Sequence, residues 1–145
     1  MISVIQLVTH GNVKVDNVII GAIQKGIVAL IGIEKTDTEK DVEKLFNKII
    51  HYRIFPDSAG KTNLGLKDVQ GGLLLVSQFT LVADTTKGLR PGFSKGMAPE
   101  RGKELFEYLV AHACQNYPLV ASGQYGANMQ INLCNDGPMT FILRS

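Results

Sequence analysis

Residues 71–81 read GGLLLVSQFTL and contain the strongest predicted strand of the chain, over residues 73–81. The first half of this strand is apolar at every position, which is typical of a strand that is buried on both faces. Its second half is interrupted by three polar side chains, at Ser77, Gln78 and Thr80. Because polar groups at strand ends often mark a ligand site, this stretch predicts a candidate pocket as well as the centre of a sheet.

Apolar runs nearer the amino terminus predict further strands. Residues 27–33 are nearly all apolar, as in a second strand that is buried on both faces. Residues 2–8 are rich in β-branched side chains, which favours a strand. Val13 and Val15 alternate with polar residues and lead through Asp16-Asn17 into another apolar run, which predicts a hairpin.

The carboxyl-terminal segment predicts two short strands and a turn. Residues 129–133 alternate between apolar and polar, as in a half-buried strand. Residues 135–138, which read NDGP, predict a turn before a short last strand over residues 140–143. A proline and a glycine between two strands weaken the ladder there.

Two segments have the apolar spacing of a helix. The first has a start that Thr36 or Thr38 can cap, and its stripe comprises Val42, Leu45, Phe46, Ile49 and Ile50. The second starts at Pro99, which suits a first helical turn, and its stripe comprises Leu105, Phe106, Leu109, Val110 and Ala113. Strands outnumber helices and look sequentially antiparallel, so we predict an α+β fold in one domain over residues 1–145 rather than a doubly wound parallel sheet.

The composition is that of an ordinary globular domain. The chain has 145 residues, of which 45% are hydrophobic and 19% charged. A chain of this length and composition can form a hydrophobic core that needs no disulfide or metal to stabilise it. A formal net charge of +2 is too small to indicate nucleic-acid binding by itself. Cys114 and Cys134 lie in apolar surroundings, so we expect reduced core thiols in a cytosolic protein. The sequence has neither a signal-peptide pattern nor an apolar run of ~18 residues, so we expect a cytoplasmic protein without a membrane span.

The familiar catalytic motifs are missing or misplaced. The sequence contains no P-loop, dinucleotide fingerprint or zinc-helix motif, and its three histidines are scattered, so we expect no metal and no cofactor. Residues 92–96 fit the pattern G-x-S-x-G around Ser94. That motif needs a strand that runs into the serine and a helix that leaves it, whereas a basic, flexible loop surrounds Ser94 here. A serine esterase therefore ranks below the other hypotheses.

A basic loop is predicted over residues 82–97. It carries Phe93 and three cations, Lys87, Arg90 and Lys95, which are groups that can stack a base and hold phosphates. A solvated loop with a modest excess of positive charge is the alternative. The residues show no set of nucleophile, base and orienting group, so taken alone they predict a polar pocket near strand ends, which could bind RNA, and no particular reaction.

Two segments carry a resemblance to a known family, residues 77–81 (SQFTL) and 135–140 (NDGPMT). Together with residues 4–6 (VIQ), 52–55 (YRIF) and 90–96 (RPGFSKG), they resemble the bacterial D-aminoacyl-tRNA deacylases, also called D-tyrosyl-tRNA deacylases, from end to end. The resemblance implies a homodimeric α+β protein with a mostly antiparallel, barrel-like sheet and two main helices packed outside it. It also implies hydrolysis of the ester between a D-amino acid and tRNA, without a metal or cofactor.

The same resemblance assigns residues to roles. It implies that main-chain donors near Phe79 and Thr80 polarise the ester with help from the tRNA 2′-hydroxyl, although the Thr80 hydroxyl is a candidate nucleophile. From their charge rather than from the resemblance, the cations of the basic loop, Lys87, Arg90 and Lys95, are expected to contact tRNA phosphates. The other substrate-binding residues would be Ser77, Gln78, Gly137, Pro138, Met139 and Thr140.

Within this set, Gly137 and Pro138 correspond to the family's Gly-cisPro element, which reaches into the partner subunit's pocket. The resemblance implies that this element rejects L-amino acids by bulk. Glycine has no side chain to reject, so we expect glycyl-tRNA to be hydrolysed as well.

Two positions depart from the family pattern. Met139 stands where the family usually has valine, and Leu7 stands where many members have an arginine that helps to orient the Gly-Pro element. A non-catalytic RNA-binding module that uses the basic loop is the second hypothesis, and an esterase built on Ser94 is the third.

Overall fold

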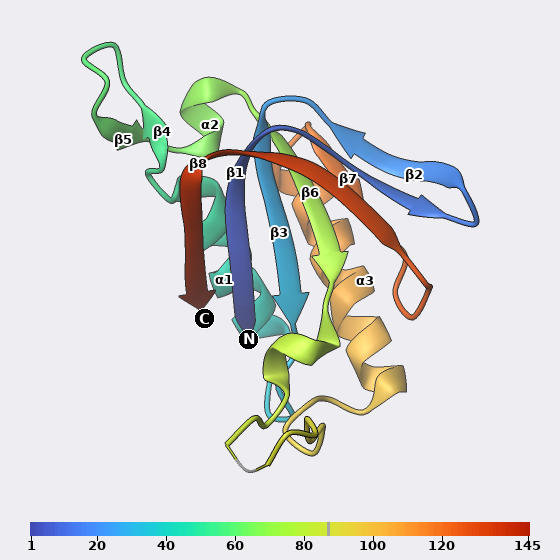
Figure 1. The fold of residues 1–145 in the computed structure, drawn as a ribbon. Helices are drawn as coiled ribbons and strands as arrows, with labels where there is room; N and C mark the ends of the chain where they lie inside the picture. Colours follow the sequence, from blue (N-terminus) through green and yellow to red (C-terminus); the bar gives the residue numbers. More distant parts are fainter. Residues whose placement is uncertain (87) are drawn as a thin grey trace.

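Two parallel strands form the centre of the sheet, β3 (Gly26–Gly32) and β6 (Gly72–Ser77). The structure is a computed structural model that describes residues 1–86 and 88–145. β3 and β6 are the apolar runs that the sequence predicts to be buried on both faces, and this prediction is confirmed. Their pairing places the carboxyl ends of both strands at the same edge of the sheet (Figure 1).

The other strands extend the sheet on both sides. The order along the sheet is β2 (Val18–Ile23), β1 (Ile2–Val15), β3, β6 and β7 (Val120–Ser122), and β8 (Gln130–Arg144) pairs with β1. β1 is antiparallel to β2, β3 and β8, whereas β7 is parallel to β6. The predicted hairpin is confirmed, because Asp16 and Asn17 turn between β1 and β2 with positive φ angles of 49° and 66°.

The sheet is therefore mixed, and the prediction of a mostly antiparallel sheet is correct only for β1 and its neighbours. Both parallel pairings join strands that are separated along the chain by a long helix, α1 (Glu39–His51) or α3 (Pro99–Asn116). A helical crossover carries the chain back to the edge from which it started, so the next strand runs in the same direction. The two long helices were themselves predicted and are confirmed.

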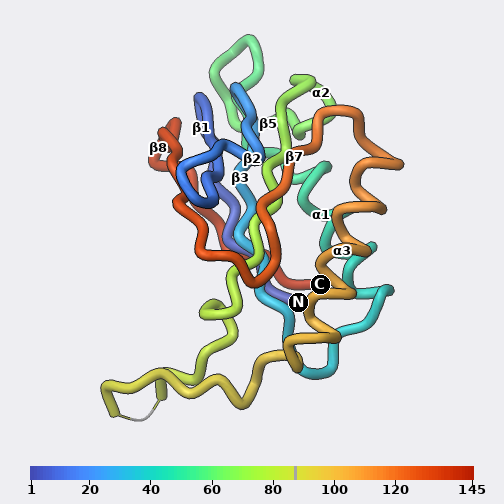
Figure 2. The backbone as a smooth tube through the Cα atoms, turned by 90° about the vertical axis from the view of Figure 1, so that its right-hand side faces the viewer, coloured from blue at the N-terminus to red at the C-terminus, as the bar shows by residue number. Residues whose placement is uncertain are grey.

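The helices pack against one face of the sheet (Figure 2). Of the two predicted caps of α1, the structure has the one at Thr38, whose backbone N–H donates to Asp41 Oδ2 at 3.0 Å. The sequence did not predict the short helix α2 (Leu66–Val69) or the small separate hairpin of β4 (Phe55–Pro56) and β5 (Thr62–Leu64).

The sheet curls until its two edges approach each other, which gives it a barrel-like shape (Figure 1). β2 and β7 form the two ends of the strand order, yet the backbone of Gly21 in β2 lies against that of Ser122 in β7. Because of this curl, successive side chains of β6 pack into two different hydrophobic cores on opposite faces of the sheet. Leu73 and Leu75 pack in the core beneath the helices, and Leu74 packs in a smaller core inside the curl.

Three further predictions are wrong. The strand predicted over residues 73–81 ends at Ser77 and passes into a 3-10 helix, η1 (Phe79–Val82). The turn predicted at residues 135–138 is an irregular part of one continuous strand, β8, and the short last strand is its second half. Cys114 and Cys134 are exposed rather than buried, because each occupies the solvent side of its element next to an inward-facing residue.

Among the described residues, no helix has the length and apolar character that crossing a membrane requires.

Candidate active site

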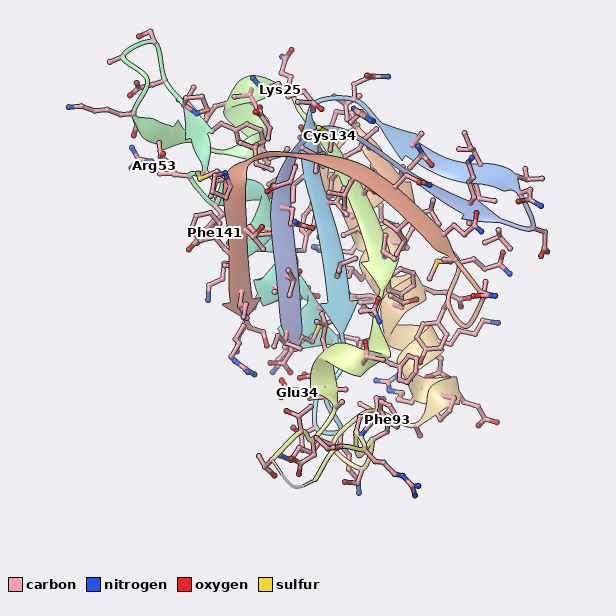
Figure 3. The ribbon with its side chains drawn as sticks, viewed as in Figure 1. Lys25, Glu34, Arg53, Phe93, Cys134 and Phe141 are labelled. Atoms are coloured by element: carbon pink, nitrogen blue, oxygen red, sulfur yellow. The ribbon has the colours of Figure 1, made fainter. Side chains whose placement is uncertain are left out.

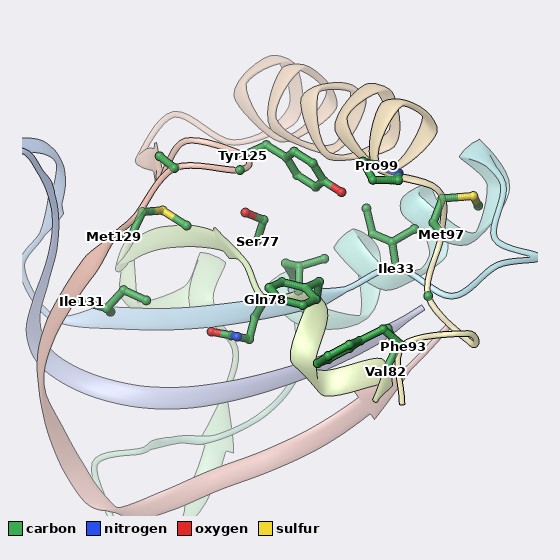
Figure 4. A pocket seen from close by; sticks show the side chains of 15 residues that line it. Ile33, Ser77, Gln78, Val82, Phe93, Met97, Pro99, Tyr125, Met129 and Ile131 are labelled. Carbon is green, nitrogen blue, oxygen red and sulfur yellow. The ribbon is translucent and has the colours of Figure 1, made fainter. Parts of the chain in front are cut away.

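A cavity of about 610 Å³ opens where β3 and β6 end (Figure 4). Its walls come from these strand ends, from η1, from the loop before α3, from the loop between β7 and β8 and from the start of β8. Most of the wall is apolar, and Ser77 and Gln78 supply polar groups at its centre. An apolar cavity with a few converging polar groups is typical of a small-molecule site. In the sequence, the polar residues at the end of the predicted strand already indicate a pocket at this place.

The geometry of η1 follows from the point at which β6 stops pairing. The Gln78 backbone N–H donates to Ile31 O at 2.7 Å, and the chain then turns so that the Leu81 N–H donates back to Gln78 O at 3.2 Å. The first N–H groups of a helix have no acceptor within that helix. The main-chain N–H groups of Phe79 and Thr80 therefore lie at the open end of η1, beside the cavity.

Among the described residues on the cavity wall, no side chain is of a type that usually serves as a general base. The Gln78 amide donates to Thr80 Oγ1 at 2.5 Å, so the threonine hydroxyl faces an amide group rather than an imidazole or a carboxylate. The residues that the structure places on the cavity wall include no histidine, aspartate, glutamate or cysteine. A side-chain nucleophile at Thr80 would have no proton acceptor of the usual kind.

Aromatic rings stand at the mouth and on one wall of the cavity. The ring centroids of Phe79 and Phe93 are 5.2 Å apart with the planes tilted by 51°, and 62% and 46% of these residues are exposed. On the wall, Tyr125 packs beside Phe106, and burial raises the pKa of its hydroxyl above the ordinary tyrosine value. Exposed aromatic faces next to an apolar cavity suit the stacking of a nucleic-acid base.

The basic loop lies beside the cavity mouth and is partly paired. Lys95 Nζ lies 3.1 Å from Asp84 Oδ2. The Thr86 hydroxyl and backbone N–H, and then Lys95, lower the pKa of Asp84 to about 2, so this carboxylate is charged at neutral pH. Arg90 is exposed and makes no ion pair with any described residue. Lys87, the third predicted phosphate contact, lies outside the described residues.

The second predicted motif lies elsewhere in the fold. Gly137 and Pro138 are exposed, are joined by a cis peptide bond and are not among the residues on the cavity wall. Figure 3 shows Cys134, shortly before this motif, at one end of the sheet and Phe93 at the opposite end. A single chain therefore does not bring its two motifs together.

The neighbours of this motif face β1 and the core rather than the cavity. Met139 is half-buried against the core beneath the helices, and Thr140 Oγ1 accepts a hydrogen bond from Gln6 Nε2 at 3.2 Å.

Several cavity residues were not predicted from the sequence, and among them are Met97, Tyr125, Met129 and Ile131. Tyr125 is the one with a local signal, because an aromatic residue between Gly123 and Gly126 in a polar stretch often faces a ligand or a core.

Ser94 has no nucleophile elbow around it, since no strand runs into it and α3 begins only at Pro99. Among the described residues, no group of three or more histidine, cysteine, aspartate or glutamate side chains is placed to hold a metal ion.

Sequence comparisons show that this chain is similar to known proteins. The sequence model described as D-Tyr-tRNA(Tyr) deacylase matches residues 4–144. A protein from Pseudomonas syringae pv. tomato (strain ATCC BAA-871 / DC3000) and one from Stutzerimonas stutzeri (strain A1501), both named D-aminoacyl-tRNA deacylase, are 52% and 50% identical over 145 residues. Both alignments cover 100% of this chain and 100% of the relative.

Solved structures agree with the fold. One described as c-Myc DNA Unwinding Element Binding Protein is 37% identical and superposes with a TM-score of 0.95, over 100% of this chain and 99% of the other. Another, described as a probable eukaryotic D-amino acid tRNA deacylase, is 15% identical with a TM-score of 0.86, over 99% and 98% of the two chains, and so supports the fold alone.

Proposed function

The chain belongs to the D-Tyr-tRNA(Tyr) deacylase family, and we propose on this premise that its cavity receives the aminoacylated 3′ end of a tRNA. The family and the names of its relatives support hydrolysis of D-aminoacyl-tRNA. The observation that carries the finer assignment is the position of η1, whose first two main-chain N–H groups have no acceptor within the helix and lie beside an apolar cavity with aromatic rings at its mouth.

In this proposal, the protein supplies binding and electrostatic stabilisation rather than a nucleophile. The terminal adenosine enters the cavity and stacks against the Phe79 and Phe93 pair. The N–H groups of Phe79 and Thr80 donate to the ester carbonyl oxygen and stabilise the negative charge that develops there. A water oxygen attacks the carbonyl carbon, the bond to the ribose oxygen breaks, and that oxygen takes up the proton that the attacking water releases. The neighbouring 2′-hydroxyl of the tRNA assists, and the products are the free amino acid and tRNA.

Stereochemical selection in this proposal requires two copies of the chain. Gly137 and Pro138 are exposed and lie away from the cavity of their own protomer. If they act on the substrate, they must therefore reach the cavity of a partner. There the carbonyl oxygens of this segment would accept hydrogen bonds from the α-ammonium group, and its backbone would occupy the space that an L-side chain needs.

The basic loop would hold the acceptor end of the tRNA. Arg90 is exposed, and the Lys95 side chain is 59% exposed even while its ammonium group pairs with Asp84. Charges of this kind contact phosphates and orient the nucleic acid without reading its sequence.

A panel of three substrates tests the function. We expect the purified protein to hydrolyse D-tyrosyl-tRNA and glycyl-tRNA and to leave L-tyrosyl-tRNA intact, because only an L-side chain meets the partner's backbone. Release of labelled amino acid measures each rate, and light scattering over a dilution series measures whether activity follows the dimer. Tight tRNA binding without turnover would favour the RNA-binding module instead. A fully active monomer, or exclusion of glycyl-tRNA, would contradict the proposed selection.

Thr80→Ala separates main-chain catalysis from a covalent mechanism. We expect only a modest loss of kcat, well short of the roughly 10⁴-fold loss that follows removal of a nucleophile, because the N–H group of residue 80 remains. Steady-state kinetics on D-tyrosyl-tRNA measure the loss, and Ser94→Ala, which tests the esterase hypothesis, should leave kcat unchanged. Mass-spectrometric detection of an amino acid bound to Thr80 would refute the main-chain mechanism.

A further inference from the structure

β8 bulges strongly at the segment that carries Gly137 and Pro138. On β1, Leu7 alone stands between Gln6, which pairs with Thr140, and Val8, which pairs with Asn135. On β8, residues 136–139 fill the same interval, so four residues face one. The extra residues cannot pair with β1 and must leave the plane of the sheet.

The side chain of Asn135 closes the base of this bulge. Its amide nitrogen donates to Leu7 O on β1 at 2.8 Å and to Met139 O at the far end of the bulge at 3.2 Å. Asn135 is half-buried. Both amide hydrogens are therefore used, and the two ends of the bulge are tied to each other and to the neighbouring strand.

The exposed part of the bulge has little other support. Asp136, Gly137 and Pro138 are all exposed, and the Asp136 carboxylate makes no hydrogen bond with any described residue. Leu7 is only 4% exposed and its side chain packs in the core, so the polar group that position 7 offers to the bulge is its backbone carbonyl. The Gln6–Thr140 hydrogen bond lies just beyond the bulge, at the solvent surface.

We propose that Asn135 is the positioning residue that sets the orientation of Gly137 and Pro138, and with it the preference for D- over L-aminoacyl-tRNA. This inference rests on the proposed function. Asn135 does not touch the substrate in this proposal. It acts by holding the carbonyl groups of the bulge in one direction. Without its two hydrogen bonds, only the covalent backbone would restrain the bulge, and the carbonyl groups would not keep one orientation.

Two variants of Asn135 and one control test the proposal. Asn135→Asp keeps the shape but turns carboxylate oxygens toward two carbonyl oxygens, and Asn135→Ala removes the donors without adding a charge. Asn132→Ala is the matched control, because Asn132 is exposed on the same strand and its amide donates to Asn12 Oδ1 at 3.3 Å, away from the bulge. The readout is the ratio of kcat/KM for D-tyrosyl-tRNA to that for L-tyrosyl-tRNA, in which the fraction of folded enzyme cancels.

We expect the ratio to fall about tenfold or more in both Asn135 variants, as the loss of two hydrogen bonds allows, and to stay within about twofold of the wild type in Asn132→Ala. Hydrogen–deuterium exchange of residues 136–140 should accelerate only in the Asn135 variants, and this readout needs no substrate. An unchanged ratio and unchanged exchange would overturn the proposal. A wild-type protein that fails to hydrolyse D-tyrosyl-tRNA would instead overturn the proposed function, and the exchange measurement would still decide the role of Asn135.

Discussion

Gly137→Ala should lower kcat/KM for D-aminoacyl-tRNA by about 100-fold or more, while the domain remains folded. A Cβ atom at position 137 would collide with the backbone nitrogen of Met139 and lie 2.9 Å from Asn135 Oδ1. Met139 is half-buried and packs against the core, and Asn135 is hydrogen-bonded to β1, so neither neighbour can yield easily. The bulge itself must move, and a displacement of about 1 Å at a positioned group can cost about 10²-fold in rate.

The effect should be confined to catalysis because Gly137 is exposed and packs in neither core. Cys134→Ala is the matched control, since it makes a change of similar size at an exposed position on the same strand. Steady-state kinetics with D-tyrosyl-tRNA measure the rate, and thermal melting measures the stability of both variants. Full activity of Gly137→Ala would mean that this segment has no part in the reaction.

Gly26→Ala should destabilise the whole domain by about 3 kcal/mol or more, because overpacking at a site that cannot relax reaches this size. Gly26 of β3 pairs with Gly72 of β6, and a Cβ atom at position 26 would collide with Gly72 O and lie 2.6 Å from Gly72 N. Gly72 has no room to retreat, since a Cβ atom on its own α-carbon would meet Ile23 at 2.7 Å. The same strand pair brings Ile31 and Ser77 side by side at the cavity, so activity should fall with stability.

Denaturant and thermal melts measure this effect, and a loss of 3 kcal/mol corresponds to a decrease in Tm of about 10 °C for a domain of this size. Gly60→Ala is an informative control. A Cβ atom there would have open space around it, but φ is +76°, so only the backbone cost of about 1–2 kcal/mol applies. Equal losses in the two variants would argue against the close approach of β3 and β6.

The elements that the sequence predicts correctly are those with a strong local period. The stripe from Val42 to Ile50 makes one face of a helix apolar, and that face alone can be buried. The continuous apolar run at residues 27–33 leaves no polar face for solvent, so it becomes a central strand. Asp16 and Asn17 tolerate positive φ angles and so form the predicted turn.

The predictions that fail concern how distant segments meet. Phe79, Thr80 and Leu81 fit a strand locally, yet the chain leaves the sheet after Gln78, whose N–H bonds to Ile31 O. Cys134 has apolar neighbours in the sequence, but strand alternation turns it to solvent while Leu133 faces the core inside the curl. Neighbours along a strand point to opposite faces, so apolar surroundings in sequence do not imply burial.

Periodicity along the chain is enough to predict the type of most elements, and the motifs at residues 77–81 and 135–140 are enough to predict the family. Contacts between distant segments, in contrast, place Phe93, Met97 and Tyr125 around Ser77 and keep Gly137 and Pro138 away from that cavity. The physical reason is the difference between local and long-range interactions. Periodicity and turn chemistry act within a few residues, whereas the cavity depends on helical crossovers and on strands that are far apart in the chain and pair only when the whole sheet forms.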